Sequence, residues 1–124
     1  MADPRALIGW VRRATLLAVV GGVLYAVSRF ELLEMPEDRC SPLLAIAPGT
    51  TLVVDLRAKV VEVGDVVFHE GDGGELWVGR VEALRAGGLW IVTDAPSCPV
   101  ADSRTLGEVA PERLRGRVVF GGSW

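Results

Sequence analysis

The hydrophobic and polar positions divide the chain into two parts with different patterns. The stretch 14–33 is apolar except for Ser28, Arg29 and Glu31. A helix rises about 1.5 Å per residue, so this stretch would be roughly 30 Å long, which matches the hydrocarbon core of a membrane. The pattern therefore predicts a single transmembrane helix over residues 14–33, preceded by a short N-terminal segment of residues 1–13.

Beyond residue 34 the apolar positions form short runs rich in β-branched residues, with glycines between them. The glycine-rich turn 71–74 predicts a hairpin in which Glu70 pairs with Glu75. One helical turn is expected at 111–114. We predict a mainly β fold, a small antiparallel and coiled β domain over residues 34–120, before the tail 121–124. The runs expected as strands are 51–55, 60–63, 66–70, 75–81, 89–93 and 117–120.

The charges around the apolar stretch indicate how it is oriented. Three arginines precede it and acidic residues crowd its end: Arg5, Arg12 and Arg13, then Glu31, Glu34, Glu37 and Asp38. Because positive residues favour the cytoplasmic side, we expect a single-pass protein of the inner or plasma membrane with a cytoplasmic N-terminus and an exported β domain. Two alternatives are a cleaved signal peptide, suggested by the small residues at 26–28, and a buried helix of a soluble protein. The charge asymmetry favours the anchor.

Composition narrows the possible chemistry. The net charge is −3, which gives no electrostatic case for binding nucleic acid. The chain has twelve arginines but one lysine, Lys59, and one histidine, His69. It has no phosphate-binding glycine loop, no carboxylate pair at a defined spacing and no His-rich cluster, and two cysteines cannot complete a zinc site. We therefore expect no cofactor and no metal.

A spaced set of residues in the C-terminal half carries a family resemblance. It comprises Asp94, Asp102-Ser103-Arg104, Gly107, Val109, Leu114 and Gly116-Arg117, together with Gly64-Asp65-Val66-Val67-Phe68 and Gly79-Arg80-Val81. In this order, after an N-terminal apolar stretch, the set resembles the type I signal peptidase family, the membrane-anchored Ser–Lys endopeptidases. The resemblance covers residues 14–120 and implies a signal-peptidase-like β domain.

The resemblance also implies where the catalytic residues should be. The family's nucleophile lies in Ser-Met-x-Pro-Thr-Leu, and the matching position here is Ser41, seven residues before Pro48, although the Met, Pro and Thr are replaced. The family's base, a Lys or in one branch a His, stands immediately before Arg-Val, and here that position is Gly79. A serine hydroxyl without a base is a poor nucleophile, and a positioned base is typically worth about 10²–10⁴-fold in rate.

Neither remaining candidate replaces the missing base well. The expected hairpin puts His69 on the opposite sheet face to Gly79, roughly 10 Å away along the ladder, as an exposed-face histidine. Lys59 precedes the Gly64-Asp65 turn, outside any position where the family keeps its base, and is interpreted as a solvated lysine. Ser41 itself, before a proline, is also typical of an ordinary turn residue.

By the same resemblance, Asp102, Ser103 and Arg104 support the site rather than react. The expected partner of Asp102 is Arg80, on the neighbouring strand. A catalytically inactive protein can retain these three residues for stability. Removing one partner of a partly buried ion pair is destabilising, because the other charge is left unpaired.

The two cysteines, Cys40 and Cys98, are brought close together by the family architecture. Because the predicted compartment is oxidising, we expect a Cys40–Cys98 disulfide, with two free thiols in a cytosolic domain as the alternative.

The missing base leads to a functional hypothesis. We expect a membrane-anchored, signal-peptidase-like protein that is catalytically inactive and acts as a structural or peptide-binding subunit of a membrane-associated complex. Its expected partners are the membrane, other membrane-protein subunits and extended peptide segments. The alternative is an active serine endopeptidase that processes exported proteins, with Ser41 as its nucleophile.

Overall fold

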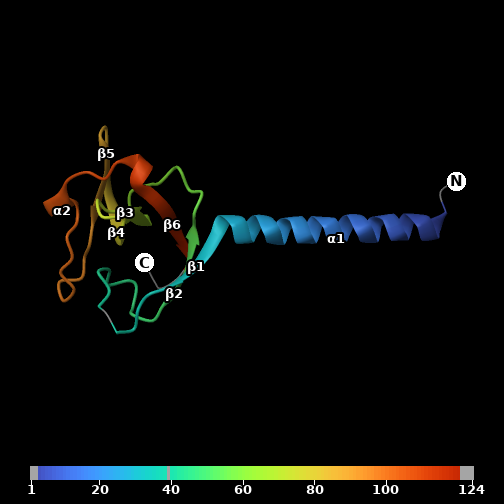
Figure 1. Ribbon diagram of the computed structural model, residues 1–124, viewed down its shortest axis with the longest axis horizontal. Coiled ribbons are helices and arrows are strands. Elements are labelled where there is room, and N and C mark those ends of the chain that lie inside the picture. Colours follow the sequence, from blue (N-terminus) through green and yellow to red (C-terminus); the bar gives the residue numbers. More distant parts are fainter. Residues whose placement is uncertain (1–2, 39, 121–124) are drawn as a thin grey trace.

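The computed structural model describes residues 3–38 and 40–120, so the tail 121–124 lies outside the described residues. A long helix projects from a β domain (Figure 1). The elements are α1 (Pro4–Arg29), β1 (Phe30–Glu34), β2 (Thr51–Asp55), β3 (Val66–Glu70), β4 (Leu76–Arg85), β5 (Gly88–Val92), α2 (Ser103–Leu106), the 3₁₀ turn η1 (Pro111–Arg113) and β6 (Leu114–Phe120).

Helix α1 begins and ends earlier than the expected 14–33. Asp3 caps its start by accepting a hydrogen bond from the Arg5 N–H, and Pro4 occupies the first turn, where it removes no internal hydrogen bond. The helix ends at Arg29 because the next five residues pair with β2 as an antiparallel strand. Expecting a helix as far as residue 33 was therefore wrong: the last apolar residues belong to the sheet.

The strands form one antiparallel sheet in the order β1-β2-β6-β3-β4-β5. The mainly β class and the N-terminal apolar helix are confirmed. The expected strand at 60–63 is not formed, because this segment turns: the Glu62 N–H donates to the Asp65 carboxylate, and the Asp65 N–H donates back to the Glu62 carbonyl. Val61 is buried, whereas Val60 and Val63 are exposed.

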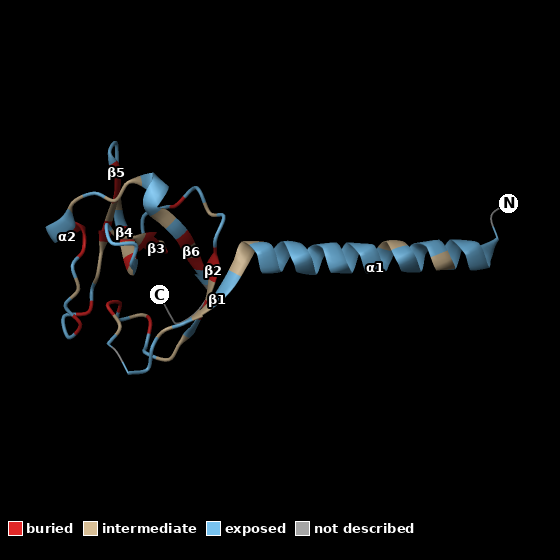
Figure 2. Ribbon diagram, in the orientation of Figure 1, coloured by how far each residue is buried: buried red, intermediate tan, exposed pale blue. Residues whose placement is uncertain are grey.

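Each face of the sheet carries its own hydrophobic cluster. The first cluster contains Leu43, Ile46, Leu52, Val54, Val66, Phe68 and Val118, and the second contains Val61, Val67, Val81, Leu89 and Ile91. Along β3 the residues alternate between the two clusters, because neighbouring strand residues point to opposite faces. Figure 2 shows that the buried residues are confined to the β domain.

Helix α1 contributes nothing to these clusters. None of its residues is buried, and its large apolar side chains are exposed along its whole length. By length and composition it can cross a membrane. The part of α1 after Arg13 is apolar on all sides and needs an apolar environment, which the described residues of the β domain do not supply.

The junction between α1 and the sheet is held by an ion pair. Arg29 donates from Nε and Nη2 to the two carboxylate oxygens of Asp55, at 3.0 and 2.9 Å, and from Nη1 to the Tyr25 hydroxyl at 2.6 Å. The Asp55 side chain is 2% exposed. Hydrogen bonds from Arg29 and from the Arg57 N–H hold the pKa of Asp55 below its usual value. The last helical residue is therefore fixed to the sheet.

Candidate functional site

Ser41 lies in an irregular segment, and its hydroxyl is engaged in a local turn. Its Oγ donates to the Leu43 carbonyl at 2.9 Å and accepts from the Leu43 N–H at 3.3 Å. Such turns are common for serine before a proline. Among the residues that the structure describes, no basic nitrogen hydrogen-bonds to this hydroxyl.

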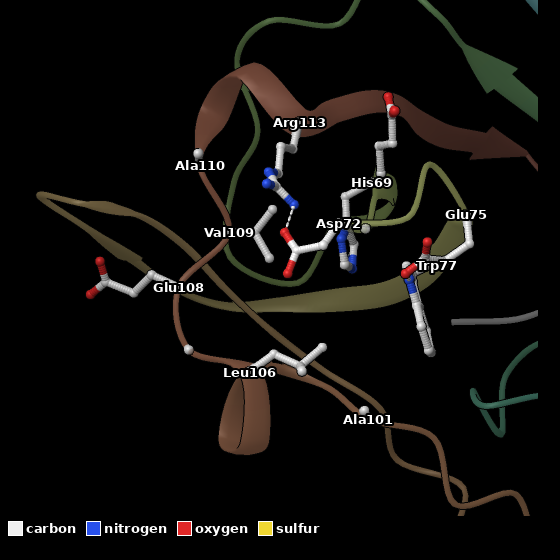
Figure 3. A pocket seen from close by; sticks show the side chains of 13 residues that line it. His69, Asp72, Glu75, Trp77, Ala101, Leu106, Glu108, Val109, Ala110 and Arg113 are labelled. Atoms are coloured by element: carbon white, nitrogen blue, oxygen red, sulfur yellow. Dashed lines mark hydrogen bonds and ion pairs between the residues drawn. The ribbon is translucent and has the colours of Figure 1, made fainter.

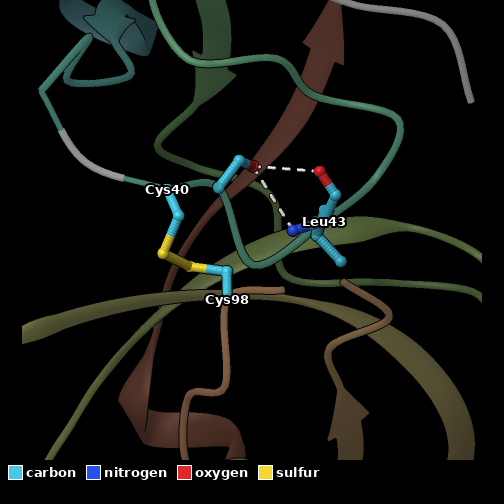
Figure 4. The surroundings of a disulfide bond; sticks show 4 residues. Cys40, Leu43 and Cys98 are labelled. Atoms are coloured by element: carbon cyan, nitrogen blue, oxygen red, sulfur yellow. Dashed lines mark hydrogen bonds between the residues drawn. A yellow bond between two sulfur atoms is a disulfide. The ribbon is translucent and has the colours of Figure 1, made fainter. Parts of the chain in front are cut away.

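The Ser41 segment is tied to the loop after β5. The expected disulfide between Cys40 and Cys98 is present, beside Leu43 (Figure 4). The Pro42 carbonyl accepts hydrogen bonds from the N–H groups of Asp94 and Ala95, both at 3.1 Å. The position of the segment is thus fixed by one covalent bond and several polar contacts.

The position expected for a base is closed. A Cβ built on Gly79 would lie 2.4 Å from Cγ2 of Ile91, a contact that real side chains do not make. Gly79 is directly opposite Val67, so the two residues share the face of the second cluster. Leu43, two residues after Ser41, packs in the first cluster, on the other face. Leu43 and position 79 are therefore on opposite faces of the sheet.

The hairpin register differs by one residue from the expected one. Glu70 pairs with Leu76 rather than Glu75, because the loop takes in one more residue and its Gly71 N–H donates to the Glu75 carbonyl. His69 is therefore opposite Trp77 and shares its face with Gly79. The prediction that His69 is exposed on the opposite face was wrong.

His69 is 8% exposed and lines a pocket of about 360 Å³, together with Trp77, Asp72, Leu106 and Arg113 (Figure 3). Burial lowers the pKa of His69, and the nearby charge of Arg113 lowers it further. Both effects favour the neutral form of the ring, which lies on the face away from Leu43. It is a buried histidine of this pocket and no partner for Ser41.

Lys59 lies in the exposed segment between β2 and β3 and lines a different pocket, beside Arg57 and Glu62. Ser41 is not among the residues that line it. The two alternative bases and the serine are thus in three separate surroundings.

Asp102 pairs with Arg104, not with Arg80. Arg104 donates from Nη2 to Oδ2 of Asp102 at 2.7 Å, and this bonding lowers the pKa of Asp102 to about 2. Arg80 instead donates to the Gly64 carbonyl at 2.9 Å. The expected pairing with Arg80 was therefore wrong. Asp102 pairs with the residue nearer in sequence because its side chain caps α2 and accepts a hydrogen bond from the Arg104 N–H. This cap places the Arg104 side chain beside the Asp102 carboxylate.

The Asp102-Ser103 pair satisfies the outer edge of β5. The Ile91 N–H donates to Ser103 Oγ and the Thr93 N–H donates to Asp102 Oδ2, both at 2.9 Å. The Leu89 N–H, on the same edge, donates to the Val109 carbonyl at 2.8 Å. Three alternate backbone donors of an edge strand thereby find acceptors, which explains why an Asp and a Ser are needed at these places.

No group of three or more potential ligands that could hold a metal ion occurs in the described ranges 3–38 and 40–120. No protein-family model matches the chain, and no curated protein matches it either.

Proposed function

We propose that the chain is a non-catalytic, membrane-anchored subunit with a signal-peptidase-like β domain, which supports or binds a partner in a membrane-associated complex. The observation that carries this proposal is the bonding of Ser41: its hydroxyl is held by Leu43, and within the described residues no base hydrogen-bonds to it. A serine hydroxyl in such a setting is a weak nucleophile near neutral pH. The arrangement therefore favours a binding or structural role over peptidase activity.

The closed position at Gly79 supports the same proposal. A lysine there would first have to displace Ile91, which is 1% exposed and packed in the second cluster. Its side chain would start on the face away from the Ser41 segment. Restoring a base would therefore require repacking, not a single substitution.

The anchor and its orientation are part of the proposal. Helix α1 would cross the inner or plasma membrane, with the N-terminus in the cytoplasm and the β domain on the exported side. The arginines before the apolar stretch and the acidic residues after it favour this direction. The Cys40–Cys98 disulfide fits an oxidising, exported compartment.

The edge of β1 is the surface that we assign to a partner. Of the two edge strands, β5 has its outer donors satisfied by the Asp102 box, whereas no described strand pairs with the outer side of β1. An extended peptide can add to such an edge by backbone hydrogen bonds. Leu32 on β1 is 69% exposed and would contact that peptide.

The test is purification of the full-length protein from its own membranes in a mild detergent. We expect it to elute with a partner as a particle larger than a monomer. Leu32→Glu should release the partner, while the matched change Leu84→Glu, at another exposed strand residue, should not. A monomer without any co-purifying protein would contradict the proposal.

The endopeptidase alternative is tested separately. Full-length protein in detergent is incubated with a substrate that carries a signal peptide, and we expect no cleavage above that of Ser41→Ala. Cleavage that Ser41→Ala abolishes would replace the proposal by the alternative.

A further inference from the structure

A short segment after β2 lies at the level of the last turn of α1. Its Leu56 N–H donates to the Arg29 carbonyl at 2.8 Å, and Arg57 Nη2 donates to the Ser28 hydroxyl at 3.4 Å. Figure 1 shows this segment, between β2 and β3, on the side of the domain where α1 enters. If α1 spans a bilayer, residues 56–60 lie at its surface.

A pocket of about 390 Å³ opens beside this segment. Four cationic side chains and two carboxylates line it, a surplus of two positive charges in a chain whose net charge is −3. These residues are Arg29, Arg57, Lys59 and Arg117, with Asp55 and Glu62. The local charge therefore suits an anionic ligand, against the sign of the whole protein.

Two of the cations are available to such a ligand. Arg29 is bound to both oxygens of Asp55, and Arg117 lies 3.8 Å from Asp65. Within the described residues, the side chain of Arg57 has only the Ser28 hydroxyl as a partner, and Lys59 forms no ion pair. Both residues are exposed.

Apolar side chains flank these cations. Leu56 is 42% exposed and Val60 is 78% exposed. A single exposed apolar residue needs no explanation, but cations alternating with apolar side chains beside the end of an apolar helix are typical of a segment at the membrane interface. The acyl chains would take the apolar groups, and the headgroups the charges.

We propose that Arg57 and Lys59 bind the phosphate of an anionic phospholipid headgroup in the leaflet where α1 ends. Leu56 and Val60 contact the upper acyl chains, and Glu62, which also lines the pocket, opposes binding of the anion. The inference rests on the proposed membrane anchoring by α1. Because Asp55 fixes α1 to the sheet, a lipid held here also sets the orientation of the β domain on the membrane.

The experiment titrates the full-length protein, in an uncharged detergent, with phosphatidylglycerol and measures the bound fraction by native mass spectrometry. Surface cations contribute to anionic-lipid binding by about fivefold each, so Lys59→Gln and Arg57→Gln should each weaken binding about fivefold. Glu62→Gln should strengthen it. Arg85→Gln removes the same charge from a residue outside the pocket and should leave it unchanged. Two control ligands are titrated in the same way: phosphatidylcholine, whose headgroup is zwitterionic, and glycerol 3-phosphate, which has the phosphate but no acyl chains.

The proposal is supported if phosphatidylglycerol binds more tightly than phosphatidylcholine and glycerol 3-phosphate, and if Arg57→Gln and Lys59→Gln each weaken that binding. Equal binding by wild type and both variants overturns it, as does binding of glycerol 3-phosphate as tight as that of the lipid, which would indicate a soluble phosphate ligand. Circular dichroism checks that each variant is folded. Flotation of the full-length protein with uncharged vesicles tests the anchor itself, so failure of anchoring is distinguished from failure of headgroup binding.

Discussion

Two buried aspartates, one at each end of the β domain, are both paired with an arginine but perform different tasks. Asp55 takes its arginine from α1, 26 residues earlier, and so joins two elements. Asp102 pairs with Arg104, two residues later, and also accepts a hydrogen bond from the Thr93 N–H at the edge of the sheet. In Figure 1, α2 lies on the side of the domain away from α1.

The two ends of the β domain also differ in the contacts that support each ion pair. The Asp102 loop is also held by the Cys40–Cys98 disulfide and by Ser103. At the anchor end, the Asp55 carboxylate binds two nitrogens of Arg29. Two further hydrogen bonds join α1 to the segment after β2, from the Leu56 N–H to the Arg29 carbonyl and from Arg57 to the Ser28 hydroxyl, but no disulfide lies there. We expect the Arg–Asp pair to contribute more to stability at the anchor end, where no disulfide supports it.

The largest effect should follow from removing the covalent tie at the Asp102 end. The disulfide joins residues 58 apart in the sequence, for which loop closure predicts about 4 kcal/mol of stabilisation. Cys40→Ser/Cys98→Ser should lose about this much free energy of unfolding, measured by denaturant titration in detergent with tryptophan fluorescence. Reducing agent should affect wild type and leave the double variant unchanged. Equal midpoints for wild type and variant would show that the loop does not need its covalent tie.

At the anchor end, Asp55→Ala should be the most damaging single change to a polar residue. It removes the acceptor of two Arg29 nitrogens and of the Arg57 N–H, so we expect a loss of about 2–3 kcal/mol. Asp72→Ala is the control, since Asp72 is 92% exposed in its ion pair and should change stability by less than about 0.5 kcal/mol. Similar losses for both variants would remove the distinction between a joining pair and a surface pair.

Asp102→Asn should cost less, about 1 kcal/mol, because the disulfide still holds its loop. The pKa of Asp102 is lowered to about 2, so its contribution is complete above the pKa of an unfolded aspartate, near 4, and is lost as the pH falls towards 2. The stability difference between wild type and variant should therefore shrink from pH 5 to pH 2. A difference that stays constant over this range would contradict the role of the ionised carboxylate.

Periodicity predicted most of the strands, and the resemblance predicted the disulfide. The partner of Asp102 was predicted wrongly, and the Arg29–Asp55 pair was not predicted. The runs at 51–55 and 66–70 are strands with these bounds, since their valines are buried or half-buried in the sheet. The strand β1 was missed because its apolar residues were counted as part of the apolar stretch 14–33, although Ser28, Arg29 and Glu31 interrupt it. The prediction of a strand at 60–63 was wrong because the Asp65 carboxylate accepts a hydrogen bond from the Glu62 N–H and forms a turn.

The candidate site was only partly predictable. Gly79 in the sequence indicated that the base is missing. That Ile91 fills the space beside this position could not be predicted, because Ile91 belongs to another strand. The face of His69 depended on whether Glu75 belongs to the loop or the strand, which a glycine-rich turn leaves undecided. Asp55 ends an apolar run and Arg29 ends another, a signal that could have suggested their pairing.

The central claim is that Ser41 is not activated, and acylation of this residue tests it most directly. Full-length protein is incubated with a serine-reactive acylating inhibitor at neutral pH, and the adduct is located by mass spectrometry of peptides, with Ser41→Ala as the reference. We predict no modification of Ser41 above that of exposed serines elsewhere in the chain. Rapid, stoichiometric acylation of Ser41 would contradict the claim, because it requires a base close to that hydroxyl.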